Sequence, residues 1–163
     1  MNLPLKIGIL SDTHGFIHPH IVSLFSQCDI VVHAGDIVDE KTLSVLTPKQ
    51  KLVAVQGNND SHLVQLKTTE LLDLPGGTLV VNHGHMYGNR QPSHSSLREA
   101  HPNAKMIVYG HTHKQLIEQD TSPWVVNPGA AGATRNQGSS KCLLLTIQSA
   151  QNWHIEPYDF SEL

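Results

Sequence analysis

The stretch Ile7-Gly8-Ile9-Leu10-Ser11-Asp12-Thr13-His14 decides the fold, because a short apolar run ends there in a turn that carries an aspartate and a histidine. The same arrangement recurs four times: Ile30–Val32 before Gly35-Asp36, Leu52–Val55 before Gly57-Asn58, Leu79–Val81 before His83, and Met106–Val108 before Gly110-His111-Thr112-His113. In an open α/β sheet, ligands gather in the crevice outside the carboxyl ends of the strands. We therefore expect the metal-capable side chains of all five turns to share one cleft.

Strand and helix signals alternate in the first half of the chain, which indicates parallel strands, whereas the second half is rich in short strands. Packing one sheet on another, with helices outside, covers the apolar faces of roughly ten strands. We predict such an α/β fold within one domain, residues 1–163. The expected strands are Lys6–Leu10, Ile30–His33, Lys51–Gln56, Glu70–Leu74, Thr78–His83, Met106–Tyr109, Gln115–Gln119, Trp124–Asn127, Lys141–Gln148 and Asn152–Glu156. The expected helices are Pro19–Gln27, Glu40–Leu46, a short segment near Ser61–Lys67, and one that Ser93 caps and that ends near His101.

Composition limits the classes of partner. The chain has 11 Lys and Arg against 14 Asp and Glu, a formal net charge of -3, so we expect no bulk binding to nucleic acid or to an anionic membrane. The N-terminus shows no signal-peptide pattern and no run is long enough to span a membrane, which predicts a soluble, cytoplasmic protein. The two cysteines, Cys28 and Cys142, lack CxxC spacing and are expected to be buried thiols.

The turns supply two carboxylates, one amide oxygen and four imidazoles: Asp12, Asp36, Asn58, His14, His83, His111 and His113. This donor set suits Mn, Fe, Zn or Ni, with Mg also allowed, and we expect manganese first among them. Seven donors exceed what one ion takes, so we predict two divalent ions about 3.5 to 4 Å apart, with Asp36 as the bridging carboxylate. Two such ions leave a local positive surplus that would attract an anionic phosphoester and generate a bridging hydroxide to attack it.

The ordered motifs resemble those of the calcineurin-like metallophosphoesterases, especially the small single-domain prokaryotic phosphodiesterases. The matching segments are Asp12-Thr13-His14, Gly35-Asp36-Ile37-Val38-Asp39, Gly57-Asn58-Asn59-Asp60, His83-Gly84-His85, Gly110-His111-Thr112-His113 and Asn127-Pro128-Gly129. The resemblance implies a four-layer α/β sandwich. It also implies two metal sites, one formed by Asp12, His14, Asp36 and His113 and the other by Asp36, Asn58, His83 and His111. The activity implied is phosphodiester hydrolysis, with Asp36 and Asn58 as catalytic residues.

The chain departs from the family pattern at two positions. Asn59 stands where many members have a histidine that binds phosphate and protonates the leaving oxygen, so Asn59 is our catalytic and substrate-binding candidate there. Because general acid catalysis is typically worth about 10² to 10⁴-fold, we expect modest rates and a preference for good leaving groups. Ala130 replaces the usual serine after Asn-Pro-Gly, without a clear effect.

Several other polar residues lie near the motifs. Arg135 could bind a substrate phosphate bidentately, although a surface salt bridge is equally consistent with its position. His33 is expected to support the site from the core, and His85 either to support it or to contact phosphate. Asp39 and Asp60 could orient ligands or cap loops, and His62 is a weak substitute for the absent acid.

A protein-interaction scaffold of the same fold, with little or no catalysis, is the alternative, as in the retromer trafficking subunit that resembles this branch. All seven ligand positions hold competent donors, which favours the enzyme. Motifs of metallo-β-lactamases, HExxH proteases, GxSxG hydrolases and P-loops are absent from the sequence. We expect a small phosphoester substrate, and leave homo-oligomerisation open.

Overall fold

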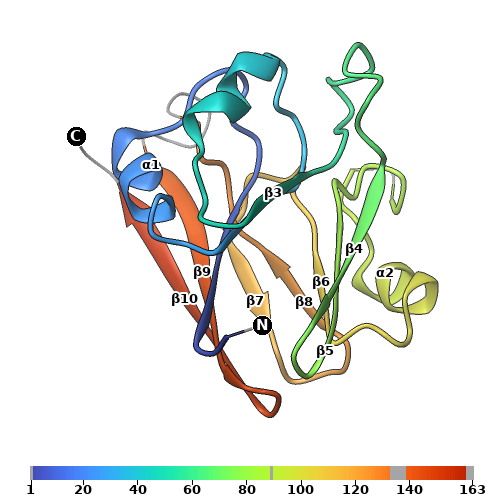
Figure 1. The fold of residues 1–163 in the computed structure, drawn as a ribbon. Helices are drawn as coiled ribbons and strands as arrows, with labels where there is room; N and C mark the ends of the chain where they lie inside the picture. Colours follow the sequence, from blue (N-terminus) through green and yellow to red (C-terminus); the bar gives the residue numbers. More distant parts are fainter. Residues whose placement is uncertain (1, 89, 133–138, 161–163) are drawn as a thin grey trace.

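Two five-stranded mixed sheets form the body of the computed structural model, which describes residues 2–88, 90–132 and 139–160 (Figure 1). The strands are β1 (Leu5–Leu10), β2 (Ile30–His33), β3 (Lys51–Ala54), β4 (Thr69–Leu74), β5 (Gly77–Asn82), β6 (Met106–Val108), β7 (Leu116–Glu118), β8 (Trp124–Asn127), β9 (Ser140–Ser149) and β10 (Asn152–Phe160). The helices are α1 (Pro19–Phe25), α2 (His94–Ala100) and the 3₁₀ helix η1 (Glu40–Val45). The first sheet has the order β10-β9-β1-β2-β3, and the second has the order β4-β5-β6-β8-β7.

Three hydrophobic clusters divide the structure into layers. The largest lies between the sheets and takes alternate residues of each strand, for example Ile7 and Ile9 of β1. The second joins α1 to the outer face of the first sheet, and the third joins Leu97 of α2 to the outer face of the second. Because side chains alternate across a strand, each sheet presents one apolar face inward and one to its helix. The predicted four-layer α/β sandwich is confirmed.

The strand directions bring the predicted turns to one end of the sandwich. β1, β2 and β3 are parallel in the first sheet, and β5 and β6 are parallel in the second. The five apolar runs therefore do not line one open sheet. They are divided between two sheets, and the carboxyl ends of these five strands lie at the top of Figure 1.

Local structure follows the sequence with two differences. β2 and β8 coincide with the predicted strands, whereas residues 40–46, expected as a helix, form the 3₁₀ helix η1. Pro48 keeps the chain just before it extended, so the segment after the Asp39 cap is too short for a regular α-helix. Residues 61–67 form isolated turns and no helix. These turns are closed by hydrogen bonds such as that from Leu66 N–H to Leu63 O at 3.1 Å.

Both cysteines lie in the cluster under α1 and are buried free thiols, as predicted. Burial raises the pKa of Cys28 to about 11 and that of Cys142 to about 12. Because the thiolate is the reactive form, neither thiol is a nucleophile near neutral pH.

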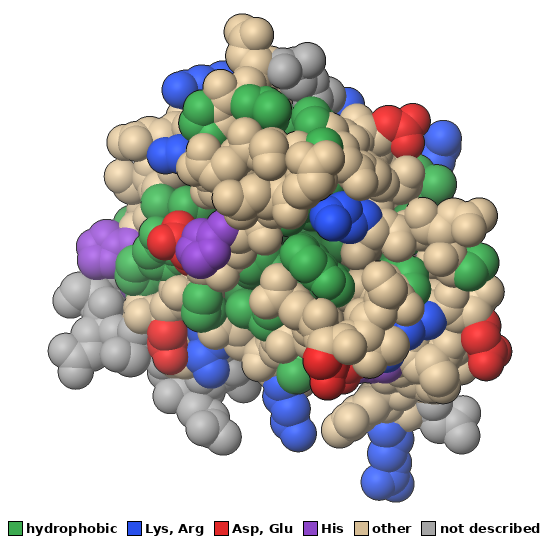
Figure 2. All heavy atoms as spheres, turned by 90° about the horizontal axis from the view of Figure 1, so that it is seen from below, with side chains coloured by type: hydrophobic (Ala, Val, Ile, Leu, Met, Phe, Trp, Pro, Cys, Tyr) green, Lys and Arg blue, Asp and Glu red, His purple; other side chains and the backbone are tan. Residues whose placement is uncertain are grey.

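The lower end of the sandwich, opposite the strand ends that carry the metal-capable residues, is shown in Figure 2. Basic and acidic side chains are interspersed there among apolar and uncharged polar ones. Within the described residues, no helix is long and apolar enough to cross a membrane.

The contact between Gly8 and α1 generates the first testable prediction. A Cβ atom at Gly8 would lie 2.7 Å from the ring of the fully buried Phe25, so a side chain there must displace the ring. We expect Gly8→Ala to lower the free energy of unfolding by about 1 to 3 kcal/mol, measured by urea denaturation. In a Phe25→Leu background the same substitution should cost less, and equal costs in both backgrounds would contradict the proposed contact.

Candidate metal centre

The loops that end the strands have an unusual backbone. Asp12, His14, Asp36, His111 and His113 all have φ between 48° and 70°, in the left-handed region that non-glycine residues rarely adopt. The loop after β1 pairs with the loop after β2 through backbone bonds, from Asp12 N–H to Gly35 O at 2.9 Å and from His14 N–H to Asp36 O at 3.0 Å. Strained residues of this kind concentrate at functional sites.

Asp12 is fully buried and uses its two oxygens differently. Oδ2 accepts hydrogen bonds from Ser11 Oγ at 2.7 Å and from the backbone N–H of His111 at 3.0 Å. Oδ1 lies 3.3 Å from His113 Nε2, 3.8 Å from His83 Nε2 and 4.0 Å from His14 Nε2. The carboxylate is thus fixed through one oxygen and presents the other to three imidazoles from both sheets.

Asp36 faces two different histidines with its two oxygens. Oδ1 is 3.4 Å from His83 Nε2, and Oδ2 is 3.8 Å from His14 Nε2. Asn59 donates to both oxygens, from its backbone N–H at 3.1 Å and its side-chain amide at 2.9 Å. Burial alone would raise the pKa of the Asp36 carboxyl, but His83 and the Asn59 donors outweigh it and hold that pKa well below its usual range.

A hydrogen bond on the side of the ring away from the carboxylates orients the imidazole of His83. Its Nδ1 lies 2.8 Å from the carbonyl oxygen of Ala34 and therefore carries a proton that it donates, so Nε2 is the ring nitrogen that faces the carboxylates. Metal-binding histidines commonly have this arrangement. Burial alone would lower the pKa of His83, but Asp36 and Asp12 outweigh it and raise that pKa.

Buried polar atoms without hydrogen bonds test whether the residues fit a metal. In the described part of the chain, Asp12 Oδ1, His14 Nε2 and His83 Nε2 are such atoms, and the two imidazole nitrogens lie 4.0 and 3.8 Å from Asp12 Oδ1. Unpaired buried carboxylate and imidazole atoms are costly, and these are ordinary ligand atoms for a divalent cation. Two groups could each hold an ion: Asp12, His14 and His113, and Asp12, Asp36 and His83. The residues present fit a metal centre.

The two remaining predicted ligands lie at the open side of the site. Asn58 Oδ1 is 3.2 Å from His111 Nδ1, and the rings of His111 and His83 have centroids 5.1 Å apart. The structure therefore brings all seven predicted ligands into one cluster.

Asp60, which was expected either to orient ligands or to cap loops, joins two loops, and Asn127, which was noted only within a motif, holds a third. The buried Asp60 carboxylate accepts backbone N–H bonds from Ile37 at 3.0 Å, Val38 at 2.8 Å and Gly57 at 2.9 Å, which joins the loops after β2 and β3. Asn127 donates to Gly110 O at 2.9 Å and to Thr112 Oγ1 at 3.0 Å, at the loop that carries His111 and His113. Both belong to the quoted motifs, but apart from Gly57, three residues before Asp60, their partners lie 15 to 23 residues away and cannot be identified from the sequence.

Glycine is required where loops meet most closely. A Cβ atom at Gly110 would overlap Ser11 Oγ, and one at Gly57 would overlap Asp36. The absence of side chains at these positions allows the loops to approach one another.

His33 lies behind the site and is fully buried, in agreement with its predicted supporting role. Its Nδ1 accepts the backbone N–H of Gly35 at 3.1 Å, so its Nε2 carries the proton and donates to Thr13 Oγ1 at 3.0 Å. Burial lowers the pKa of His33 to about 4. The neutral ring thus connects the loop of Asp12 and His14 to the loop of Asp36.

The other residues singled out from the sequence have separate positions. His62 Nε2 donates to Val38 O at 2.6 Å, and Asp39 caps η1 through Lys41 N–H at 3.0 Å. The His85 ring lies beside that of His83, tilted by 54° with ring centroids 5.5 Å apart, and burial lowers the pKa of His85. Ala130 is buried beside the site loops, and Arg135 lies outside the described residues.

Comparisons with known proteins agree with this geometry. The family model of the calcineurin-like phosphoesterase superfamily domain matches residues 5–150. A probable metallophosphoesterase of Methanocaldococcus jannaschii is 31% identical over 137 residues, 80% of this chain and 70% of that protein. A phosphodiesterase of the same organism is 29% identical over 153 residues, 77% of this chain and 83% of that protein. Wild-type Vps29 from Entamoeba histolytica, complexed with Zn²⁺, has a similar fold, with a TM-score of 0.77 and 18% identity over 96% of this chain and 99% of that one.

The three hydrogen bonds to Asp60 generate the second prediction. Asp60→Asn replaces one acceptor oxygen by a donor that faces backbone N–H groups, so we expect the free energy of unfolding to fall by about 1 to 3 kcal/mol in urea denaturation of metal-free protein. Asp39→Asn is the matched control, because that exposed side chain accepts one N–H at the end of η1. Equal effects of the two substitutions would show that Asp60 does not brace the loops.

The buried neutral His33 generates the third prediction, a pH dependence of stability. The ordinary histidine pKa of 6.5 applies to the unfolded chain, so between pH 6.5 and about 4 the unfolded state binds more protons than the folded state. Stability should be full above pH 6.5 and fall by up to about 3 kcal/mol as the pH decreases through this window. His33→Asn retains an acceptor for Gly35 and should flatten the pH profile of metal-free protein in urea denaturation. An unchanged slope would contradict the assignment.

Proposed function

This chain belongs to the calcineurin-like phosphoesterase superfamily, and from that premise we propose that it is a dinuclear metal-dependent phosphodiesterase. One observation carries the proposal: three buried atoms of candidate ligands, from Asp12, His14 and His83, converge within 4.0 Å of Asp12 Oδ1 without hydrogen-bond partners in the described residues. A divalent cation would satisfy them all. A phosphoester is the substrate class that suits a pair of cations in a chain with a formal net charge of -3.

Asp36 is the proposed bridge between two ions. Its oxygens face His14 on one side and His83 on the other, as a bridging carboxylate requires. Asp12 has only one oxygen turned to the site, because Ser11 and the His111 backbone occupy the other. One ion would be held by Asp12, His14, Asp36 and His113, and the other by Asp36, Asn58, His83 and His111.

When bound, two such ions supply a hydroxide nucleophile near neutral pH and stabilise negative charge on the phosphoryl oxygens. The chain's own residues hold the candidate ligand side chains in position for this chemistry. Ala34 O orients His83, and the two donors of Asn59 hold Asp36 in its deprotonated form. Manganese is the metal we propose, because all the donors are oxygen or nitrogen atoms.

Asn59 has a positioning role in this geometry, since its amide is engaged with Asp36 at 2.9 Å. An amide cannot donate a proton as a general acid does, and His62 is bound to Val38 O. We therefore propose that the enzyme favours diesters with good leaving groups. Contact of Asn59 with substrate stays a prediction.

An interaction scaffold is the second candidate function, supported by the similarity of fold to Vps29, a protein named for vacuolar sorting. The two functions differ in what they require of the metal centre. A scaffold needs no catalytic activity from the metal centre, whereas a phosphodiesterase would lose activity when the carboxylate proposed to bridge the two ions is removed.

Hydrolysis of bis-p-nitrophenyl phosphate provides the fourth prediction and the test of the proposed function. We expect purified protein to bind two Mn²⁺ per chain by elemental analysis and to hydrolyse this diester. Asp36→Asn should lower kcat by at least about 100-fold. Substituting a residue that only orients a metal ligand typically lowers activity by about 10 to 100-fold, and loss of the bridging ligand itself should lower it at least as much. Asp73→Asn, at an exposed residue of β4 whose carboxylate accepts a hydrogen bond from the Thr78 hydroxyl, should leave the rate unchanged. Two bound ions with no activity on any phosphoester would favour the scaffold, and a single ion would refute the dinuclear centre.

A further inference from the structure

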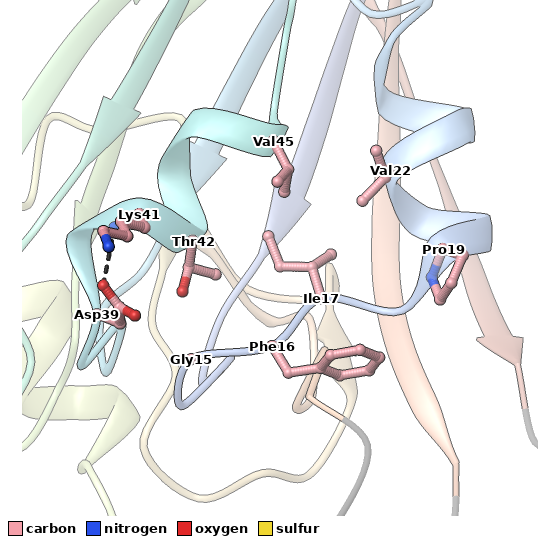
Figure 3. A pocket seen from close by; sticks show the side chains of 9 residues that line it. All are labelled: Gly15, Phe16, Ile17, Pro19, Val22, Asp39, Lys41, Thr42 and Val45. Carbon is pink, nitrogen blue, oxygen red and sulfur yellow. Dashed lines mark hydrogen bonds between the residues drawn. The ribbon is translucent and has the colours of Figure 1, made fainter.

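The two α-helices are attached to the sheets by different interactions. α1 packs on the first sheet through apolar side chains, and Figure 3 shows Val22 of α1 and Val45 of η1 turned into the space between these two helices. α2 contacts the second sheet through Leu97 and, in addition, through a series of bonds between charged and polar side chains. Strands β5 and β6 of that sheet lead to the candidate ligands His83 and His111. The polar contacts of α2 are therefore attached to the sheet that supplies these two imidazoles.

Three side chains, those of Glu118, His94 and Tyr109, form this series, which we call the His94 network. His94 Nδ1 lies 3.1 Å from Glu118 Oε2, and His94 Nε2 lies 2.8 Å from the Tyr109 hydroxyl. Arg98, also on α2, bonds to the other oxygen of Glu118 and lowers the pKa of that carboxyl. Because an ionised carboxylate only accepts, His94 Nδ1 carries a proton, and Nε2 of the neutral ring accepts the O–H of Tyr109. Each side chain thus orients the next.

Tyr109 connects the His94 network to both ligand-bearing loops of the second sheet. It is 4% exposed and directly precedes Gly110 and His111 in the loop after β6. Its ring also packs against the loop after β5, since a Cβ atom placed on Gly84, the residue after His83, would lie 3.2 Å from Tyr109 Cδ2. The two loops are joined by the backbone bond from Gly110 N–H to His83 O at 3.0 Å. A shift of the Tyr109 ring would therefore disturb both loops.

The hydroxyl of Tyr109 depends on an acceptor. Burial raises the pKa of Tyr109, so the hydroxyl stays protonated at neutral pH, and buried donors of this kind normally have partners. His94 Nε2 is such an acceptor, and its removal would leave a buried O–H to find another partner. The side chain of His94 thereby holds the ring in its place against the loop after β5.

We propose that His94 is a positioning residue for the second of the two proposed ions. Oriented by Glu118, it fixes the ring of Tyr109. That ring in turn holds the two loops that carry His83 and His111. This inference rests on the proposed dinuclear centre and deepens it, because it assigns the affinity for one ion to side chains on the outer face of the second sheet.

The two proposed ions depend on the His94 network to different extents. The second ion takes both of its imidazoles, those of His83 and His111, from loops that Tyr109 contacts. The first ion takes only His113 from the second sheet. Its other ligands follow β1 and β2, whose loops are joined by backbone bonds such as that from His14 N–H to Asp36 O at 3.0 Å. Loss of the network should therefore weaken one ion selectively.

Calorimetric titration of metal-free protein with Mn²⁺ tests this selectivity. His94→Leu removes both ring nitrogens, and we expect it to weaken one of two binding events about tenfold and to leave the other within twofold of wild type. His94→Gln, whose amide oxygen can replace Nε2 as the acceptor for Tyr109, should restore most of the affinity. Tyr109→Phe should reproduce the loss, and adding His94→Leu to it should cause no further loss, because both substitutions break the same bond.

His101→Leu is the matched control, because it makes the same replacement at the other end of α2. The His101 ring lies beside that of Tyr87, with centroids 6.4 Å apart, and is not part of the His94 network. This variant should leave both binding events unchanged. Equal weakening by His94→Leu and His101→Leu, or no rescue by His94→Gln, would overturn the proposal by reducing His94 to a residue that stabilises the helix.

NMR of the metal-free protein provides a readout that does not depend on metal or on activity. Long-range ¹H–¹⁵N spectra should show His94 protonated at Nδ1 and unprotonated at Nε2, and the opposite tautomer would contradict the network. Two bound ions without hydrolysis of any diester would refute the phosphodiesterase, while selective weakening in His94→Leu would still support the positioning role. Full activity with two unchanged binding events in His94→Leu would support the enzyme and refute the positioning role.

Discussion

Asp12 places a carboxylate at the junction of the two sheets, where no solvent reaches it and where only one of its oxygens has hydrogen-bond donors. The other oxygen faces three imidazoles at distances of 3.3 to 4.0 Å. A buried charge is costly unless an opposite charge lies beside it. Part of the site follows from this constraint, because His14, His83 and His113 lie where a cation beside Asp12 could be reached.

The sandwich supports this arrangement by combining rigid strands with strained loops. The inter-sheet cluster fixes the strand ends, while five of the seven predicted ligands have a left-handed backbone. Residues outside the ligand set hold those loops together. Asp60 joins the loops after β2 and β3, His33 joins those after β1 and β2, and Asn127 holds the loop after β6. Such conformations persist only where the surroundings determine them fully.

The sequence predicts the strands and the convergence of the ligands well, because alternating apolar residues and turn residues are local signals. β2 and β8 have the predicted bounds, and all seven ligands meet. The division of the five runs between two sheets depends on long-range pairing that no local pattern contains. The same holds for Asp60, whose partners at Ile37 and Val38 are 23 and 22 residues away.

Because the candidate ligands come from both sheets, the order of synthesis of the chain also limits when the proposed metal centre can form. A chain emerging from the ribosome presents Asp12, His14, Asp36 and Asn58 first, and the imidazoles from β5 and β6 arrive only after most of the chain has been made. Because domains fold as units during synthesis, a nascent N-terminal half has no complete cage for an ion. The proposed metal centre would therefore be complete only after one sheet has docked on the other, and the cation captured then would be the one that is abundant in that compartment.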